Sequence, residues 1–295
     1  MEKGMNFFLD RYKKLGEQVS RIKLRPSLRV NTLKISEAEL QKRLKKQGVK
    51  LEKIPYAQNG FFYSSKFSLG AITEYLLGYF YLQEAAAQIP VQILDPKPDE
   101  IVLDCCASPG GKTTQISQFM KNKGILIALD KKKHRIVSLK TNLERCGVDN
   151  CIAYLMDANK LASLNMQFDK ILLDAPCSGN FVTDPAWFKK RNIEGIRRAS
   201  EIQKSFIEKS LSVLKKGGIL VYSTCSLEPE ENELNMQWML KRFKVKIEKI
   251  NIAVGSNGLT DVFGKKLDKS IANCRRFWPN KTNTEGFFIA RIKKP

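Results

Sequence analysis

From about residue 95 onward, short apolar runs alternate with segments that have the spacing of amphipathic helices. The runs are continuously apolar, which is typical of strands buried on both faces of a parallel sheet. Helices between such strands cover the two faces. We therefore predict an α/β fold with a mostly parallel sheet, in which two β-rich segments, 245–252 and 286–292, form a closing hairpin at one edge. The predicted strands are 100–104, 124–130, 152–157, 170–174 and 218–224, and the predicted helices are 113–120, 133–146 and 195–214.

The charge of the chain favours a polyanionic partner. Lys and Arg number 51 against 30 acidic residues, which gives a net charge of +21. Nucleic acid is the natural partner of such a surface, because each neutralised phosphate releases condensed counterions. A ribosome-rich cytosol or a salt- or heat-adapted proteome is the alternative explanation. No run approaches the roughly 18 consecutive apolar residues of a membrane span, and residues 1–6 lack the apolar core of a signal peptide. We expect a cytoplasmic protein.

The first 80 or so residues have a different pattern. Segments 1–25 and 36–47 are predicted to be helical, with Ser36 as the N-cap of the second helix, and 28–33 has strand character. We expect a small N-terminal α/β domain over residues 1–80 whose basic surface holds RNA, followed by a catalytic domain over residues 81–295. A charged run is more often only a solvated helix face, so this segment is weak evidence by itself. Its basic residues include Lys42, Arg43, Lys45 and Lys46.

The cysteine and histidine usage limits the chemistry. The seven cysteines are an odd number and include no Cys-x-x-Cys pair, which argues against a disulfide framework and a Cys-only zinc site. The only histidine, His134, lies in the basic run 131–135, where we expect a solvated helix start. We therefore predict a reducing compartment and no bound metal. Any cysteine chemistry must then work without a histidine base.

A glycine-rich turn, 104–113, follows the first predicted strand and opens a helix. Gly111, Lys112 and Thr113 imitate the end of a phosphate-binding P-loop, but the first glycine of that motif is replaced by Cys106. The first glycine of a dinucleotide-binding turn is also missing. These departures argue against a binding site for a nucleotide phosphate at this turn and against a P-loop NTPase.

Carboxylates at three successive strand ends suit a nucleoside cofactor. Asp104 and the backbone N–H groups of the helix start can hold the amino-acid moiety of S-adenosyl-L-methionine. Asp130 is placed to accept hydrogen bonds from ribose hydroxyls, and Asp157 to bind the adenine amino group. Each aspartate taken singly is better explained as a helix cap or loop anchor. Three of them in register at the ligand-binding edge of an α/β sheet favour a nucleoside cofactor, and the turn before them suits S-adenosyl-L-methionine.

Two cysteine motifs, 174–179 and 222–233, follow predicted strands that we expect to be neighbours. Cys177 and Cys225 should therefore converge beside the methyl donor. A buried cysteine is usually inert packing, but polar, turn-like sequence beyond a strand end is where reactive groups are found. Spacing does not decide which thiol attacks.

Methylation of cytosine at C5 is a reaction that needs two thiols. A thiolate that adds to C6 makes C5 nucleophilic enough to take a methyl group, and a second thiol assists loss of the C5 proton. Asp174 can hydrogen-bond the base at N3 or N4. Lys112 is a candidate for supporting the same base or lowering a thiol pKa.

These motifs resemble the Sun/Fmu family of RNA cytosine-C5 methyltransferases, and the resemblance extends over nearly the whole chain. It implies a Rossmann-like class I methyltransferase fold with a mostly parallel seven-stranded sheet and a small N-terminal α/β domain. The matching segments are 28–34, 78–84, 104–113, 174–179, 222–233, 275–279 and 285–290.

The resemblance also implies residue roles. The cysteine of the Thr-Cys-Ser motif, Cys225, is the nucleophile in that family, and the cysteine of the Asp-Ala-Pro-Cys motif, Cys177, assists product release. Ser108 stands where the family often has alanine, a small change that we expect to be harmless. The implied cofactor contacts are Cys106, Ala107, Ser108, Pro109, Gly110, Gly111, Lys112, Asp130, Asp157 and Asp174, with Arg135 as a further candidate.

The compact layout is similar to archaeal members of the family that modify tRNA, as is the segment 142–150. By this analogy we predict a tRNA substrate, methylated near the junction of the variable loop and the T stem, and a monomeric enzyme. Ribosomal RNA is the alternative, and a non-catalytic RNA-binding scaffold is a distant one. An exocyclic-amine methyltransferase would have Asn-Pro-Pro-Tyr in place of the residues at 174–177.

Overall fold

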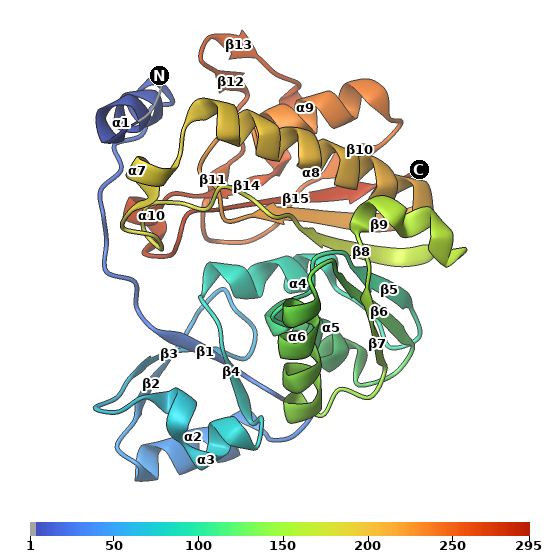
Figure 1. Cartoon of the computed structure of the whole chain (residues 1–295). Helices are drawn as coiled ribbons and strands as arrows, with labels where there is room; N and C mark the ends of the chain where they lie inside the picture. Colours follow the sequence, from blue (N-terminus) through green and yellow to red (C-terminus); the bar gives the residue numbers. More distant parts are fainter. Residues whose placement is uncertain (1–3) are drawn as a thin grey trace. The chain divides into compact units, whose positions relative to one another are not determined.

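The computed structural model describes residues 4–295, and Figure 1 labels its elements. The chain divides into two compact units. One contains the chain up to Leu24 together with Leu173–Pro295, and the other is Arg25–Leu172. The N-terminal helix therefore belongs to the same unit as the segment Leu173–Pro295.

Nine strands of the described chain form one sheet in the order β11-β14-β15-β9-β8-β5-β6-β7, with β10 paired to β15. β5 pairs in parallel with β6 and β8, and β6 with β7, whereas β15 pairs antiparallel with β9. The strands are β5 (Ile101–Asp104), β6 (Ile125–Asp130), β7 (Cys151–Leu155), β8 (Phe168–Asp174), β9 (Leu214–Thr224), β10 (Lys246–Glu248), β11 (Ser256–Asn257), β14 (Arg275–Phe277) and β15 (Phe287–Lys293).

The predicted α/β class with a mostly parallel sheet is confirmed. Seven strands, β14-β15-β9-β8-β5-β6-β7, make the expected sheet, and the short strands β10 and β11 extend it. The predicted edge hairpin is wrong in its connection. β10 does pair antiparallel with β15, but β11 to β14 intervene along the chain. β15 also lies inside the sheet, because its side chains are buried along most of its length and it pairs on both edges.

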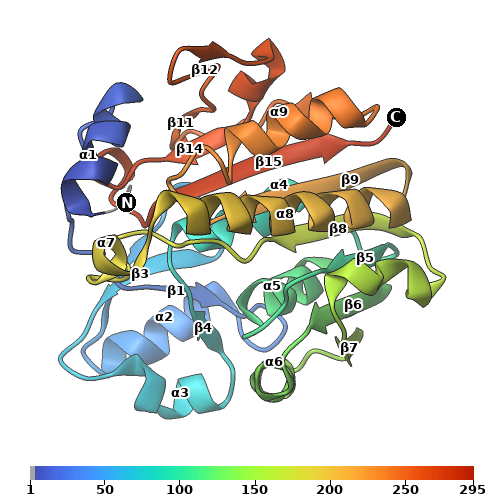
Figure 2. The same cartoon turned by 45° about the horizontal axis from the view of Figure 1, so that its top comes forward.

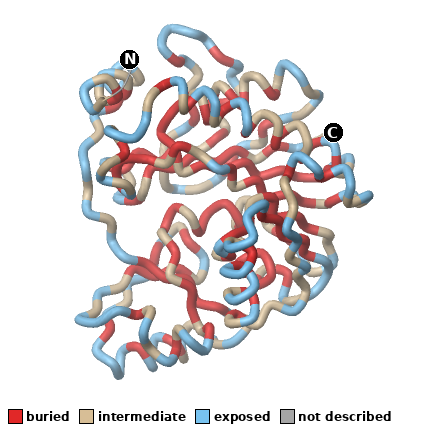
Figure 3. Tube along the Cα trace, in the orientation of Figure 1, coloured by how far each residue is buried: buried red, intermediate tan, exposed pale blue. Residues whose placement is uncertain are grey.

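A second, antiparallel sheet occupies the start of the Arg25–Leu172 unit, with strand order β2-β3-β1-β4. Its core is apolar and includes Leu28 and Val30 from β1 and Leu40 and Leu44 from α2; Figure 3 shows β1 as a buried segment. Ser36 caps α2 as predicted, since its side chain accepts a hydrogen bond from the Glu39 N–H. The elements are β1 (Ser27–Val30), β2 (Lys50–Lys53), β3 (Gly60–Ser64), β4 (Phe80–Leu82), α2 (Glu37–Lys46) and α3 (Thr73–Leu76).

The predicted helix over residues 1–25 is too long. Helix α1 covers Met5–Lys14, residues 1–3 lie outside the described part, and Gly16 has the positive φ of +84° that no helix continues through. Phe8 and Tyr12 from α1 pack with Phe181, Trp187 and Trp278 in one apolar cluster. The helix is thus held by side-chain packing with the C-terminal part of its own unit.

Helices α5, α6 and α8 agree with the sequence prediction, and α6 begins and ends at the predicted residues, whereas α4, α7, α9 and α10 were not predicted. Figure 2 shows α8 and α9 side by side along β9 and β15. No helix of residues 4–295 is both long and apolar enough to cross a membrane. The helices are α4 (Ile89–Leu94), α5 (Gly111–Met120), α6 (Lys133–Cys146), α7 (Trp187–Lys190), α8 (Ile193–Val213), α9 (Glu233–Arg242) and α10 (Pro279–Thr282), with 3-10 turns at Leu69–Ala71, Ala86–Gln88, Ala158–Leu164 and Lys269–Asn273 and a β12–β13 ribbon (Asp261–Val262, Lys265–Lys266).

Candidate active site

Two thiols meet where β8 and β9 end. The Sγ atoms of Cys177 and Cys225 lie 3.1 Å apart, and both side chains are half-buried. The strands that carry them stay in register beyond β8, because the Ala175 N–H donates to the Ser223 carbonyl at 2.8 Å. Asn180 reaches across and donates to the Cys225 carbonyl at 2.8 Å. Neighbouring strand ends therefore bring the two thiols into contact.

Asp174, the last residue of β8, belongs to the same cluster. The Ser223 hydroxyl on β9 donates to its Oδ1 atom at 2.7 Å, and the carboxylate is half-buried. The hydrogen bond fixes the orientation of the carboxylate beside the loop that carries Cys177. A carboxylate so held is suited to pairing with the polar edge of a bound base.

Three of the other cysteines, Cys146, Cys151 and Cys274, have the character of packing residues. All seven lie in the described part of the chain, and none is in a disulfide. Burial raises the pKa of Cys151 to about 12 and raises the pKa values of Cys146 and Cys274. These three thiols stay protonated at neutral pH, and only a thiolate is strongly nucleophilic.

The glycine-rich turn joins β5 to α5 inside the Arg25–Leu172 unit. Asp104, which is buried at the end of β5, accepts a hydrogen bond at 2.8 Å from the Thr113 hydroxyl in the first turn of α5. Gly110 has a φ of +111°, which residues other than glycine rarely adopt. It is the N-cap of α5, and no side chain caps the first backbone N–H groups of this helix from that position. Cys106 and Lys112 are half-buried along this turn. The amide groups that open α5 suit the carboxylate of an amino-acid moiety.

Asp130 and Arg135 lie against this turn. Arg135 pairs through Nε with Asp130 at 3.1 Å and donates through Nη2 to the Ser108 carbonyl at 2.6 Å. The Ser108 hydroxyl in turn donates to the Arg135 carbonyl at 2.8 Å, so the serine found in place of the family's alanine ties the turn to α6. The Lys132 N–H donates to the other Asp130 oxygen at 3.0 Å. A carboxylate has about four acceptor positions, so these contacts leave Asp130 able to bind ribose hydroxyls as well.

Asp157 has a local structural role in addition to its predicted one. It caps the 3-10 turn Ala158–Leu164 by accepting from the Asn159 N–H at 2.9 Å. Its half-buried carboxylate follows β7, the strand next to β6. The turn, Asp130 and Asp157 therefore present backbone N–H groups and carboxylate oxygens within the Arg25–Leu172 unit.

Sequence reasoning missed Arg29 of β1. Its side chain is buried, and its guanidinium donates to Gln83 at 3.0 Å, to Thr114 at 2.8 Å and to the Gly111 carbonyl at 3.1 Å. Burial lowers the pKa of Arg29 to about 10. The arginine thereby connects the N-terminal sheet to the first turn of α5. The sequence did contain a signal for a buried arginine, because Arg29 stands between two apolar residues of a predicted strand, Leu28 and Val30.

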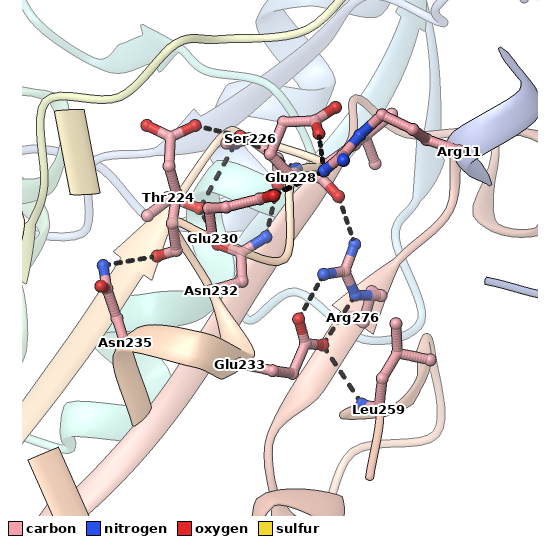
Figure 4. Close-up of polar contacts among 12 residues, drawn as sticks. Arg11, Thr224, Ser226, Glu228, Glu230, Asn232, Glu233, Asn235, Leu259 and Arg276 are labelled. Atoms are coloured by element: carbon pink, nitrogen blue, oxygen red, sulfur yellow. Dashed lines mark hydrogen bonds and ion pairs between the residues drawn. The ribbon is translucent and has the colours of Figure 1, made fainter. Parts of the chain in front are cut away.

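Buried charges also surround the loop after Cys225, as Figure 4 shows. Glu233 pairs with Arg276 at 2.5 Å, and both side chains are fully buried. Glu228 accepts from the Tyr12 hydroxyl at 2.6 Å and pairs with Arg11 at 3.2 Å. Burial raises the pKa of Glu228 to about 7. These contacts anchor the loop to β14 and to helix α1.

Comparison with known families and proteins gives consistent matches. Residues 91–293 match the 16S rRNA methyltransferase RsmB/F family, and residues 2–85 match the N-terminal domain of 16S rRNA methyltransferase RsmF. The chain is 38% identical over 281 residues to a tRNA (cytosine(49)-C(5))-methyltransferase of Pyrococcus abyssi, covering 92% of this chain and 89% of that protein. It is 38% identical over 276 residues to a 28S rRNA (cytosine-C(5))-methyltransferase of Mus musculus, covering 91% of this chain but only 35% of the mouse protein.

Solved structures agree with these matches. A methyltransferase homolog protein from Pyrococcus horikoshii superimposes with a TM-score of 0.88 at 41% identity, covering 99% of this chain and 95% of the other. NSun6 from Pyrococcus horikoshii, solved with SFG, gives a TM-score of 0.83 at 30% identity, covering 96% and 93% of the two chains. Both likenesses extend over both units of the chain.

Proposed function

We propose that this chain, which belongs to the RsmB/F family of methyltransferases, transfers a methyl group from S-adenosyl-L-methionine to C5 of a cytosine in RNA. The observation that carries the proposal is the contact of Cys177 with Cys225 at 3.1 Å, at the ends of adjacent strands. Two half-buried thiols in contact, without a disulfide and without a histidine beside them, match a reaction that uses one thiol to attack and one to release.

The steps follow from the two thiols. The Cys225 thiolate forms a bond to C6 of the cytosine, and the electron pair moves toward C5. Asp174 hydrogen-bonds the base edge and stabilises the charge that develops there, with Lys112 as a second supporting group. When bound, S-adenosyl-L-methionine supplies an electrophilic methyl group that C5 accepts. The C5 proton is then transferred away with the assistance of Cys177 and passes to solvent. The electron pair of the C5–H bond re-forms the C5–C6 double bond, the C6–S bond breaks, and Cys225 leaves as thiolate.

The cofactor is assigned to the residues predicted from the sequence. The turn from Cys106 to Lys112 would hold the amino-acid moiety, Asp130 the ribose and Asp157 the adenine, with Asp174 as a further contact. Arg135 is assigned an indirect role, because its guanidinium holds Asp130 and the Ser108 carbonyl in place. NSun6 from Pyrococcus horikoshii, whose structure was solved with SFG, supports a cofactor site in this fold.

We propose tRNA as the substrate, with methylation near the variable loop and T stem. The support is the tRNA enzyme of Pyrococcus abyssi, which this chain matches over 89% of that protein. Ribosomal RNA is the second candidate, favoured by the family description and by the mouse relative. The N-terminal domain, residues 1–80, is assigned to RNA binding, and the enzyme is proposed to act as a monomer in the cytoplasm, without a metal.

Labelled-methyl transfer into a mixture of tRNA and ribosomal RNA tests the function. We expect label in tRNA, at a cytosine that resists bisulfite conversion. Label found only in ribosomal RNA would identify ribosomal RNA, and not tRNA, as the substrate. Label at any atom other than cytosine C5 would overturn the reaction, and cofactor binding without transfer to either RNA would identify a non-catalytic scaffold.

A further inference from the structure

Glu231 is a fully buried acid, six residues after Cys225, whose carboxylate binds residues next to the two thiols. Its Oε1 atom accepts from the Ser178 N–H at 2.9 Å and from Gln203 Nε2 at 2.8 Å. Its Oε2 atom accepts from the Ser178 and Ser226 hydroxyls, each at 2.5 Å. The carboxylate thus has four donors, about the number that it can accommodate.

The four bonds connect the two thiol loops. Ser178 follows Cys177 directly, and Ser226 follows Cys225 directly. The two serine hydroxyls also lie 3.1 Å from each other. Gln203, on helix α8, adds a bond to the Pro176 carbonyl at 3.0 Å. We call Glu231, Ser178, Ser226 and Gln203 the Glu231 clamp.

The clamp is itself held rigidly. All four side chains are buried. Tyr222 on β9 donates to the Glu231 carbonyl at 2.5 Å and to Gln203 at 3.1 Å, and Asn235 donates to Gln203 at 2.9 Å. Burial raises the pKa of Glu231, whereas its hydrogen-bond donors favour the charged form. Burial of a carboxylate costs free energy, and three of the four bonds to this one come from the thiol loops, which indicates a role in the placement of those loops.

We propose that Glu231 is a positioning residue that sets the separation of Cys177 and Cys225 by binding the serine after each of them. The expected effect on the reaction rate rests on the proposed function, whereas the expected effect on the distance between the two thiols does not. Cys225 acts at C6 and Cys177 at the neighbouring atom C5, so their relative placement must match the base. Displacement by about 1 Å costs up to about 100-fold in rate.

Three variants separate a clamp from a mere buried charge. Glu231→Gln keeps the bonds, because the amide oxygen accepts from both N–H donors while the amide NH2 group donates to both hydroxyls. Glu231→Ala removes all four bonds. The double variant Ser178→Ala/Ser226→Ala removes the two hydroxyl bonds to the carboxylate, with the contact between the two hydroxyls and the bond from the Glu228 N–H to Ser226, and leaves the two N–H bonds to the carboxylate. Glu230→Gln is the matched control, since the neighbouring Glu230 binds Arg11 at 2.7 Å.

The first measurement needs no RNA. A short bifunctional thiol reagent is applied to each folded variant, and the Cys177–Cys225 cross-link is quantified by peptide mass spectrometry, with thermal unfolding as the check on folding. We expect wild type, Glu231→Gln and Glu230→Gln to cross-link at similar rates. Glu231→Ala and the double serine variant should cross-link about tenfold more slowly.

The second measurement is methyl transfer to RNA. We expect kcat of the double serine variant to fall about tenfold with little change in KM, and covalent enzyme–RNA adduct to accumulate because release is impaired. Equal cross-linking in all folded variants would overturn the positioning role, whether or not the protein methylates RNA. Glu231→Gln behaving like Glu231→Ala would also overturn it, because charge rather than the hydrogen bonds would then matter. Slower cross-linking without any methyl transfer in wild type would support the clamp and reject the proposed function.

Discussion

Cys177 and Cys225 are chemically identical groups to which the proposed reaction gives different tasks. Their Sγ atoms are in contact at 3.1 Å, so position alone does not distinguish attacker from helper. The distinction comes from the resemblance of the two motifs to those of a known family. It is testable because the two tasks fail at different steps.

Cys225→Ala is expected to abolish methyl transfer and to leave no covalent RNA adduct, because no thiolate can add to C6. Cys177→Ala should slow turnover about 100-fold and trap an enzyme–RNA adduct that is visible on a denaturing gel. Cys274→Ala serves as the control, because burial raises the pKa of this thiol and keeps it protonated. This variant should form no excess adduct. Adduct in Cys225→Ala would exchange the two roles.

Glu228 predicts a pH dependence of stability. Its pKa rises from 4.5 in the unfolded chain to about 7 in the fold because of burial. A raised folded-state pKa means that the stabilising contribution is full below pH 4.5 and is lost as the pH rises through about 7. From pH 5 to pH 8, the free energy of unfolding should therefore fall more in wild type than in Glu228→Gln. Urea unfolding of both proteins at the two pH values measures this difference. Parallel falls in the two proteins would contradict the assignment, because all other groups are common to both.

At the scale of elements, close backbone approaches place the helices. Gly78 follows α3 with a φ of +72°, and a Cβ atom there would lie 1.9 Å from the Arg145 carbonyl in α6. Asn31 joins the same segments by donating to the Gly78 carbonyl and to the Cys146 carbonyl, each at 2.8 Å. The contact between the two helix ends therefore requires a residue without a side chain.

Gly78→Ala should destabilise the chain by about 3 kcal/mol, from backbone strain and overpacking together. Gly48→Ala is the matched control, because Gly48 has a φ of +78° but nothing within 4 Å of the added Cβ. It should cost only about 1 kcal/mol. Urea unfolding of both variants measures the difference. Equal losses in the free energy of unfolding would show that the close approach to Arg145 does not contribute to the cost of the added methyl group.

At the scale of the whole molecule, the net charge of +21 predicts RNA binding that weakens steeply with salt. Helix α2 carries three exposed lysines without an ion pair described for them, Lys42, Lys45 and Lys46. Replacing all three by alanine should reduce the slope of log affinity against log salt by about 2 to 3 if they bind phosphates. Filter binding of tRNA between low and high salt measures the slope. The control is Lys244→Ala/Lys246→Ala/Lys249→Ala, and equal slopes in the two triple variants would remove α2 from the RNA-binding surface.

The local pattern was sufficient for elements whose signal is local. Helix α6 was predicted to the residue because its apolar spacing, a strand before it and Gly147 after it all lie within one stretch of chain. The predicted helix over 1–25 was too long because charged and apolar residues keep a helical spacing past Gly16, where the backbone turns. The antiparallel pairing of β10 with β15 was predicted correctly, but their connection as a hairpin was wrong, because β11 to β14 lie between them and such short strands leave little local signal.

The cysteine motifs show the same division most clearly. The sequence alone determined the α/β class, the carboxylates at the strand ends and the two motifs that carry Cys177 and Cys225, because strand periodicity and motif spacing are local properties of a chain. Only the tertiary structure decided that the two thiols touch, that Arg29 holds the turn at Gly111, and that Glu231 binds the serine after each cysteine. These contacts join residues far apart in the sequence, and a buried polar side chain acquires its partners only when packing excludes water from it.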